Sequence, residues 1–172
     1  MIKNRLFWML SFILAISILF VLTYREQNIN INPSFQESSM KYLHLINKRG
    51  NEIRWELSAI KATIPEDKKK IFLQSPSLRI NNSPEIYLTS GNGIYEVEKD
   101  NVTLSRPVEI NIKDAIFETD TLIWNSKDEL ISTDDPVQVK GKNYIINGTG
   151  LTAQVTQQKV RILNNVKAIF YN

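Results

Sequence analysis

Apolar residues follow two different patterns along the chain. From Leu6 to Tyr24 the sequence runs for 19 residues without a charge, and from Met40 onward apolar and polar residues alternate. A helix of that length extends about 28 Å, which is close to the roughly 30 Å hydrocarbon core of a bilayer. We therefore predict a transmembrane helix at residues 6–24, with the anchor residues Leu6, Trp8, Phe20 and Tyr24.

A cleaved signal peptide is the alternative interpretation of this segment. Signal peptides have an apolar region of roughly 7–15 residues followed by a small-x-small cleavage site. The apolar stretch here is longer, and it runs into Leu22-Thr23-Tyr24-Arg25-Glu26 without such a site. An uncleaved anchor is therefore favoured.

The residues on either side of the predicted helix indicate its orientation. Lys3 and Arg5 precede it, and positive residues favour the cytoplasmic side of a membrane. We expect residues 1–5 in the cytoplasm and everything after the helix on the other side. Residues 25–39 are polar, contain Pro33 and lack periodicity, so they predict a tether.

The alternation in the rest of the chain predicts strands. Ile53–Ala59, Val108–Ile112 and Val137–Lys140 each place apolar residues at every second position, as a strand with one buried face does. Turn-forming residues such as Asn81–Pro84 separate these runs, and no stretch sustains a helical period. We predict an all-β domain over residues 40–172.

A longer period accompanies the alternation. Pro76, Pro107, Pro136 and Asn165 are spaced by 31, 29 and 29 residues, and each begins a similar short strand. We predict about four units of about 30 residues, each with the layout strand, turn, strand, Pro/Asn-Val, strand, which stack to complete one another's cores. Proline is compatible with strand starts or bulges but not with the middle of a central strand.

Composition narrows the chemistry. The 172 residues include no cysteine and one histidine, His44, which excludes a thiol nucleophile and a multi-histidine metal site. No nucleophile–base pair is evident, and the phosphate-binding pattern G-x-x-x-x-G-K-[ST] does not occur. We expect no enzymatic activity, no metal and no cofactor.

The charges are nearly balanced. The net charge is +3, of which Lys3 and Arg5 contribute two, and no concentrated basic face predicts nucleic-acid binding. The run Lys68–Lys70 is interpreted as a solvated turn, with contact to acidic lipid phosphates as the alternative. Glu118 and Asp120 are interpreted as part of a solvated strand face rather than as an acid–base pair.

The order of anchor, tether and strand repeats carries a family resemblance. The most specific segment lies between Gly50 and Ala62, where a hairpin enters R-W-x-L-x-A-x-x-A. Over nearly its whole length the chain resembles the LptC family of lipopolysaccharide export proteins. The resemblance implies an open, twisted β-jellyroll in the periplasm, held at the inner membrane by one span. It also implies that lipopolysaccharide arrives from an inner-membrane ABC transporter, the energy source, and leaves to a soluble periplasmic β-jellyroll protein.

Alternation and the resemblance together predict a lipid-binding groove. In a narrow jellyroll the inward side chains would serve both as core and as lipid contacts, and an ordinary packed core is the alternative for each of them. Trp55 and Trp124 are the strongest candidates for wall positions that meet acyl chains. The predicted groove residues are Trp55, Leu57, Leu73, Leu88, Ile110, Phe117, Trp124, Val139, Ile146, Leu151, Ile162 and Phe170.

The two ends of the strand series predict docking edges. The final run, residues 160–171, has no charge after Lys167, and an unpaired edge accepts a strand from another chain. Folding back onto its own sheet is the alternative. The predicted edge residues are Tyr42, His44 and Ile46 toward the membrane complex, and Val166, Ala168 and Phe170 toward the soluble partner.

Two functions remain open at this point. Sheltering an acyl chain of a dozen carbons from water is worth about 10 kcal/mol, at roughly 0.8 kcal/mol for each CH₂. A groove supplies that shelter but cannot extract lipid from a bilayer, so the work must come from a partner ATPase. We predict a membrane-anchored lipopolysaccharide conduit. The alternative is a structural adaptor that joins envelope proteins edge to edge without binding lipid.

Overall fold

The computed structural model of the chain describes residues 37–171. The predictions for residues 1–5, for the helix at 6–24 with Leu6, Trp8, Phe20 and Tyr24, and for most of the tether therefore lie outside the described residues. Within the described range, no helix is long and apolar enough to cross a membrane.

Nine long strands account for nearly all of the described chain. The first begins two residues before the predicted start of the domain at Met40. The strands are β1 (Ser38–Arg49), β2 (Glu52–Ile64), β3 (Lys70–Ile80), β4 (Ile86–Glu96), β5 (Asn101–Ile112), β6 (Ala115–Asn125), β7 (Leu130–Gly141), β8 (Tyr144–Gln154) and β9 (Lys159–Phe170).

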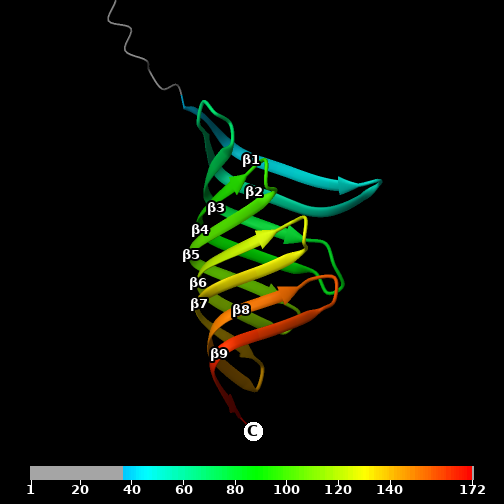
Figure 1. Cartoon of the computed structure of the whole chain (residues 1–172), viewed down its shortest axis with the longest axis vertical. Coiled ribbons are helices and arrows are strands. Elements are labelled where there is room, and N and C mark those ends of the chain that lie inside the picture. The colour runs from blue at the N-terminus through cyan, green and yellow to red at the C-terminus, as the bar shows by residue number, and fades with distance from the viewer. Residues whose placement is uncertain (1–36, 172) are drawn as a thin grey trace, which may run out of the picture. The chain divides into compact units, whose positions relative to one another are not determined.

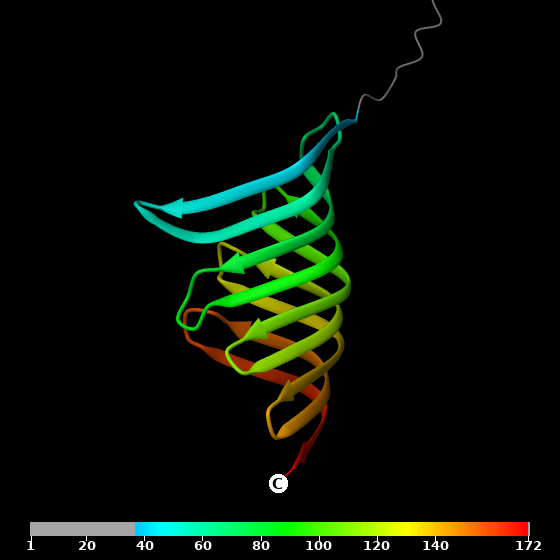
Figure 2. The ribbon, with the colours of Figure 1, turned by 180° about the vertical axis from the view of Figure 1, so that it is seen from behind.

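The strands form one antiparallel sheet in chain order, from β1 to β9. Each strand is joined to the next by a hairpin, and the sheet coils as successive strands are added (Figures 1 and 2). β1 and β9 each have a neighbour in the sheet on one side only. The predicted all-β class is confirmed, and the sheet is open at both ends.

The eight hairpin turns lie alternately at the two ends of the strands. We call the turns at residues 50–51, 81–85, 113–114 and 142–143 the A turns, and those at 65–69, 97–100, 126–129 and 155–158 the B turns. Each B turn contains a residue with positive φ, namely Lys68, Asp100, Glu129 and Gln158. A residue in the left-handed region of backbone conformation is therefore common to all four B turns.

The predicted repeat has the right period but the wrong layout. Pro76, Pro107 and Pro136 lie inside β3, β5 and β7, and Asn165 lies inside β9. Pro107 falls within a register shift between Ser105 and Val108, and a comparable shift ends at Pro136. Because a bulge accommodates the missing N–H and lets the ladder continue, the two short runs around each proline form one bent strand. The unit is therefore a two-stranded hairpin.

The core lies on one face of the bent sheet. One row of cross-strand neighbours runs through all nine strands, and we call it the central inner row. Its members are Leu45, Leu57, Leu78, Leu88, Ile110, Phe117, Val139, Ile146 and Ala168. An apolar stripe therefore follows the sheet from its first strand to its last.

Candidate functional site

The candidate site is the interior enclosed by the two halves of the bent strands. We call the half that carries the A turns the A arm and the half that carries the B turns the B arm. Trp55 on the A arm packs edge-on against Tyr95 on the B arm, with ring centroids 6.0 Å apart. The Trp55 indole Nε1 also donates a hydrogen bond to Ser126 Oγ of a B turn, at 2.9 Å. Since β2 is not the sheet neighbour of β4 or β6, these contacts cross the interior.

Polar contacts between turns hold the two arms together. Arg54 forms an ion pair with Glu129, and the Asn82 Nδ2 donates to the Val155 carbonyl at 2.8 Å. The Gln158 Nε2 donates to the carbonyl of Ser83. Both ribbon views place the β3–β4 turn beside the β8–β9 turn (Figures 1 and 2). We call this set of contacts the latch.

A cavity of about 350 Å³ lies at the latch. Both predicted tryptophans line it, Trp55 from the A arm and Trp124 from the B arm. Its charged lining residues are Lys48, Arg49, Arg54, Lys127, Asp100 and Glu129. The buried Trp124 Nε1 has no hydrogen-bond partner among residues 37–171. The latch region is therefore a junction of polar groups over an apolar floor.

Burial along the A arm changes from one end of the sheet to the other. Its inner residues Trp55, Ile80 and Ile86 are buried, with 3–6% of their surface exposed. Farther along the same row Ile112 and Tyr144 are half-buried, and Phe170 is 74% exposed. The interior is thus closed over β2–β4 and opens toward β9.

Burial along the B arm is greatest in the middle strands and is lost at β9, where Val160 is 44% exposed. Tyr95 in β4 is half-buried, whereas Val102, Trp124 and Ile131 in β5–β7 have at most 2% of their surface exposed. Each arm is therefore best covered where the latch brings the other arm over it.

The predicted groove residues lie on the inner face, as the alternation indicated. Phe117, Ile146 and Ile162 are half-buried, and Phe170 points from the last strand with most of its surface exposed. Their contact with lipid stays a prediction. The remaining groove residues are buried, namely Trp55, Leu57, Leu73, Leu88, Ile110, Trp124, Val139 and Leu151.

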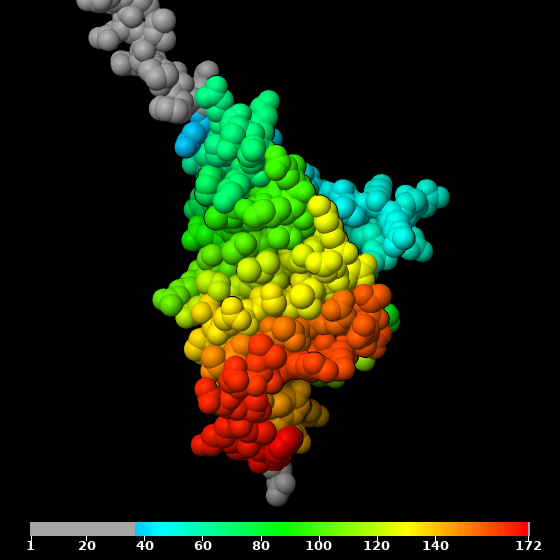
Figure 3. All heavy atoms as spheres, viewed as in Figure 1, coloured from blue at the N-terminus to red at the C-terminus, as the bar shows by residue number. Residues whose placement is uncertain are grey.

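The predicted edge residues lie on β1 and β9, the two outermost strands. Tyr42 is 80% exposed and has a left-handed φ of 59°, while Ile46 is also exposed. At the other end Val166, Ala168 and Phe170 are all exposed. Figure 3 shows β9, in red, at the end of the described domain away from β1. Both edges are accessible to an added strand, and their partners stay predictions.

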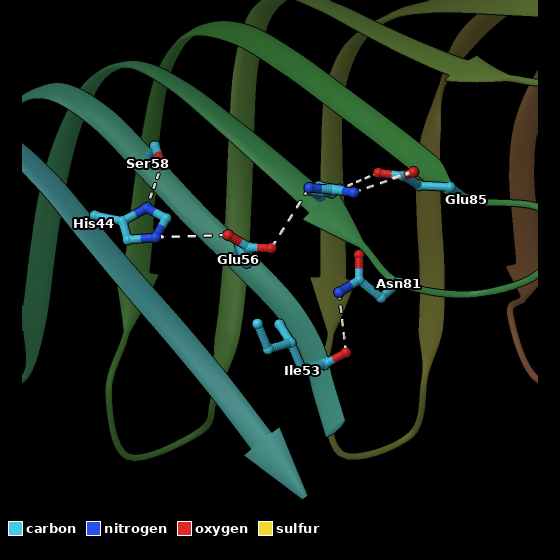
Figure 4. Close-up of polar contacts among 7 residues, drawn as sticks. His44, Ile53, Glu56, Ser58, Asn81 and Glu85 are labelled. Carbon is cyan, nitrogen blue, oxygen red and sulfur yellow. Dashed lines mark hydrogen bonds and ion pairs between the residues drawn. The ribbon is translucent and has the colours of Figure 1, made fainter. Parts of the chain in front are cut away.

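His44 belongs to a polar network on the outer face of β1–β3 (Figure 4). Its Nδ1 lies 2.8 Å from Ser58 Oγ, and its Nε2 lies 3.5 Å from Glu56 Oε2. Glu56 also lies 3.7 Å from the Arg79 guanidinium, which pairs with Glu85. Hydrogen bonding and charge attraction from Glu85 raise the pKa of Arg79 further above its usual value. The network ties the first edge strand to its neighbours.

Carboxylates that could have suggested catalysis are paired with cations. Glu118 accepts from Lys140 Nζ at 2.7 Å, and Asp120 accepts from Arg106 at 2.9 Å. The two acids border an outer-face cavity of about 770 Å³ at the bends of β4–β8. Within residues 37–171, no group of three or more potential metal ligands occurs. The surface interpretation of Glu118 and Asp120 agrees with these contacts.

The basic run Lys68–Lys70 lies at the first B turn and the start of β3. Lys70 Nζ is 3.2 Å from Glu96 Oε1, and Lys69 Nζ is 3.8 Å from Glu98. Hydrogen bonds from Lys99 and Lys70 lower the pKa of Glu96. Two of the three lysines thus pair with acids near the adjacent B turn, as a solvated turn would.

The latch residues were not found from the sequence. Asn82 and Val155 are 73 residues apart, and Ser83 and Gln158 are 75 apart. Neither alternation nor a local motif relates positions so distant, so no sequence signal identified them.

Comparisons with known proteins agree with this geometry. A family model described as "LptC: Lipopolysaccharide-assembly, LptC-related" matches residues 8–172. Among solved structures, the chain is similar to LptH, described as the LptA homologous periplasmic component of the conserved lipopolysaccharide transport device from Pseudomonas aeruginosa. The TM-score is 0.55 at 11% identity, over 69% of this chain and 95% of that one, so this likeness shows the fold alone. The comparison with curated proteins found no match.

Proposed function

The chain belongs to the LptC-related family of lipopolysaccharide-assembly proteins, and from this membership we propose that it carries lipopolysaccharide through the periplasm while anchored in the inner membrane. The observation that supports this most is the central inner row, which is apolar in every strand. With strands roughly 4.8 Å apart, eight steps from β1 to β9 give a path of about 38 Å. An acyl chain that followed that path would meet an apolar side chain in every strand.

The direction of transfer is proposed from the family membership and assigned to the two edges. The lipid enters from an inner-membrane ABC transporter complex at β1 and leaves at β9 to a soluble periplasmic β-jellyroll protein. Backbone pairing at each edge would join the partners' inner faces to this one. The ATPase of the transporter supplies the work, and this chain supplies shelter worth about 0.8 kcal/mol for each acyl CH₂ kept from water.

Lipid must displace protein contacts to enter this interior. Leu57, Leu78 and Leu88 are completely buried against neighbouring side chains, so the arms separate where acyl chains pass. The half-buried residues Phe117 and Ile146 lie beyond the latch, in the part of the interior that is already partly open. We propose that lipid contacts this region without first separating the arms.

An adaptor without lipid contact is the second candidate, because the same completely buried leucines would also form an ordinary core. A label on the inner face distinguishes the two functions. Since the chain has no cysteine, an environment-sensitive fluorophore can be placed uniquely at Ile146→Cys in the purified full chain, with Glu109→Cys on the outer face as the matched control.

Titration with lipopolysaccharide should shift the emission of the label at position 146 to the blue, because acyl chains replace water there. The label at position 109 should not respond. Equal responses at both positions, or none at position 146 over the concentrations that saturate binding, would leave the adaptor as the function.

A further inference from the structure

The cavity at the latch, which we call the latch cavity, carries an excess of positive charge. It is lined by the cations Lys48, Arg49, Arg54 and Lys127 and by the carboxylates of Asp100 and Glu129. Both acids already have partners, because Glu129 pairs with Arg54 and Asp100 accepts from the Tyr95 hydroxyl at 2.9 Å. Lys48 and Arg49 are exposed and form no ion pair with any of residues 37–171. Two charges at the rim can therefore pair with an anion.

A buried donor at the same cavity lacks an acceptor. Trp124 lines the cavity with 2% of its surface exposed, and no group of the described domain accepts a hydrogen bond from its Nε1. On the other arm, the Nε1 of Trp55 donates to Ser126. An indole N–H can only donate, and a buried donor without a partner costs free energy. What Trp124 lacks is therefore an acceptor, which an anion also is.

The floor of the latch cavity is apolar. Trp55, Ile80 and Val155 line it, and each has only 3–6% of its surface exposed. A ligand that matches both rim and floor has an anionic group joined to an apolar portion. Among anionic groups, a phosphate ester carries up to two charges at neutral pH and several acceptor oxygens, and it suits the fork of an arginine guanidinium.

We propose that the latch cavity binds a phosphate group of the transported lipid, with Lys48, Arg49 and Arg54 as its cations and Trp124 Nε1 as a donor. This inference rests on the proposed function and assigns the lipid headgroup a site of its own. Because the phosphate and the Glu129 carboxylate both pair with Arg54, the phosphate competes with an ion pair that holds the arms together. Binding of the headgroup thus loosens the latch where acyl chains must separate the arms, and it makes the buried Trp124 Nε1 accessible.

The lipid affinity of charge variants tests this site. The reporter is the fluorophore at Ile146→Cys in the purified full chain, kept in a micelle of uncharged detergent. Lys48→Gln with Arg49→Gln removes two rim charges, and Lys113→Gln with Lys142→Gln removes two charges from other A turns as the matched control. These four side chains are exposed, so the substitutions should leave folding intact. Each protein is titrated with lipopolysaccharide and with lipopolysaccharide from which the phosphates have been removed.

The rim variant should bind the phosphorylated lipid about tenfold more weakly than the chain that carries only the label, because each exposed ion pair contributes a few-fold to affinity. This difference should shrink at high salt. The control variant should match the labelled chain, and all three proteins should bind the phosphate-free lipid alike. An unchanged affinity of the rim variant, or an equal loss with both lipids, overturns the inference, while the response of the label shows that the proposed function stands.

Inorganic phosphate distinguishes a lipid headgroup from a free ion as the ligand. The readout is the indole N–H signal of Trp124 in ¹H–¹⁵N NMR spectra of the full chain, which shifts when an acceptor arrives. We expect a saturable shift with the phosphorylated lipid that is absent with the phosphate-free lipid. A shift with inorganic phosphate but not with the phosphorylated lipid overturns the headgroup assignment, and no shift with either overturns the anion site. If the label at position 146 responds to no lipid, the proposed function fails, and the Trp124 signal still decides whether the cavity binds phosphate.

Discussion

Truncation of two residues in the same inner row tests whether the interior is closed at one end and open at the other. Leu88 and Ile146 both belong to the central inner row. Leu88 is completely buried under the latch, whereas Ile146 is half-buried beyond it. Substitution of either by alanine removes three carbons, so the difference in effect reports the difference in enclosure.

The expected magnitudes follow from burial. Leu88→Ala loses about 2.4 kcal/mol of transfer free energy and leaves a cavity, which brings the total loss to about 3 kcal/mol. Ile146→Ala should cost about 1 kcal/mol, because its side chain is already partly in water. For a domain of this size these losses correspond to melting-temperature decreases of about 12 °C and about 4 °C.

Thermal unfolding of the purified full chain, followed by circular dichroism in the strand region, measures both values. Ile145→Ala on the outer face of β8 is the control, since it reports the cost of losing a β-branched residue from the strand. Equal losses for Leu88→Ala and Ile146→Ala, after subtraction of this control from the Ile146→Ala value, would refute the account of an interior that opens toward β9.

Three further predictions concern the latch, a bend and a half-buried phenol. Arg54→Ala should lower the free energy of unfolding by less than about 1 kcal/mol, because its ion pair with Glu129 is partly exposed. It should nevertheless increase acrylamide quenching of the tryptophans, and unchanged quenching would show that the pair does not hold the arms together. Gly93→Ala should lower the free energy of unfolding in urea by about 1–3 kcal/mol, because the added Cβ would lie 3.1 Å from Pro76 Cγ. An unchanged free energy of unfolding would contradict tight packing of β4 against Pro76. Burial and the hydrogen bond to Asp100 raise the pKa of Tyr95, so the unfolded chain loses this proton first and stability falls above about pH 10. Tyr95→Phe should lessen the fall in the urea midpoint between about pH 9 and about pH 11; an identical fall would exclude Tyr95 as a cause.

Alternation was sufficient to predict the fold class and the inner face. A strand places every second side chain on one face, so Leu57 and Leu88 could be assigned to the interior without knowing which strands pair. The unprotected run at the C-terminal end of the chain could likewise be assigned to an edge. Both are local properties that the sequence displays directly.

The layout within each repeat could not be predicted because proline gives an ambiguous signal. Pro107 was compatible with a strand start or a bulge, and only the hydrogen-bonded ladder on both sides of it shows that β5 continues through the bend.

The latch could not be predicted for another reason. Arg54 and Glu129 meet only because the coil of the sheet brings the turns of β2 and β6 together, and that coil is a property of the whole sheet.

The most direct test of the proposed function is whether lipopolysaccharide contacts the inner face in cells. A photoreactive residue at Phe117 or Ile146 should yield lipopolysaccharide adducts that disappear when the partner ATPase is inactive, while the outward control at Glu109 yields none. Interior positions that give no lipid adduct while β9 still crosslinks to a protein partner would contradict the conduit and establish the adaptor.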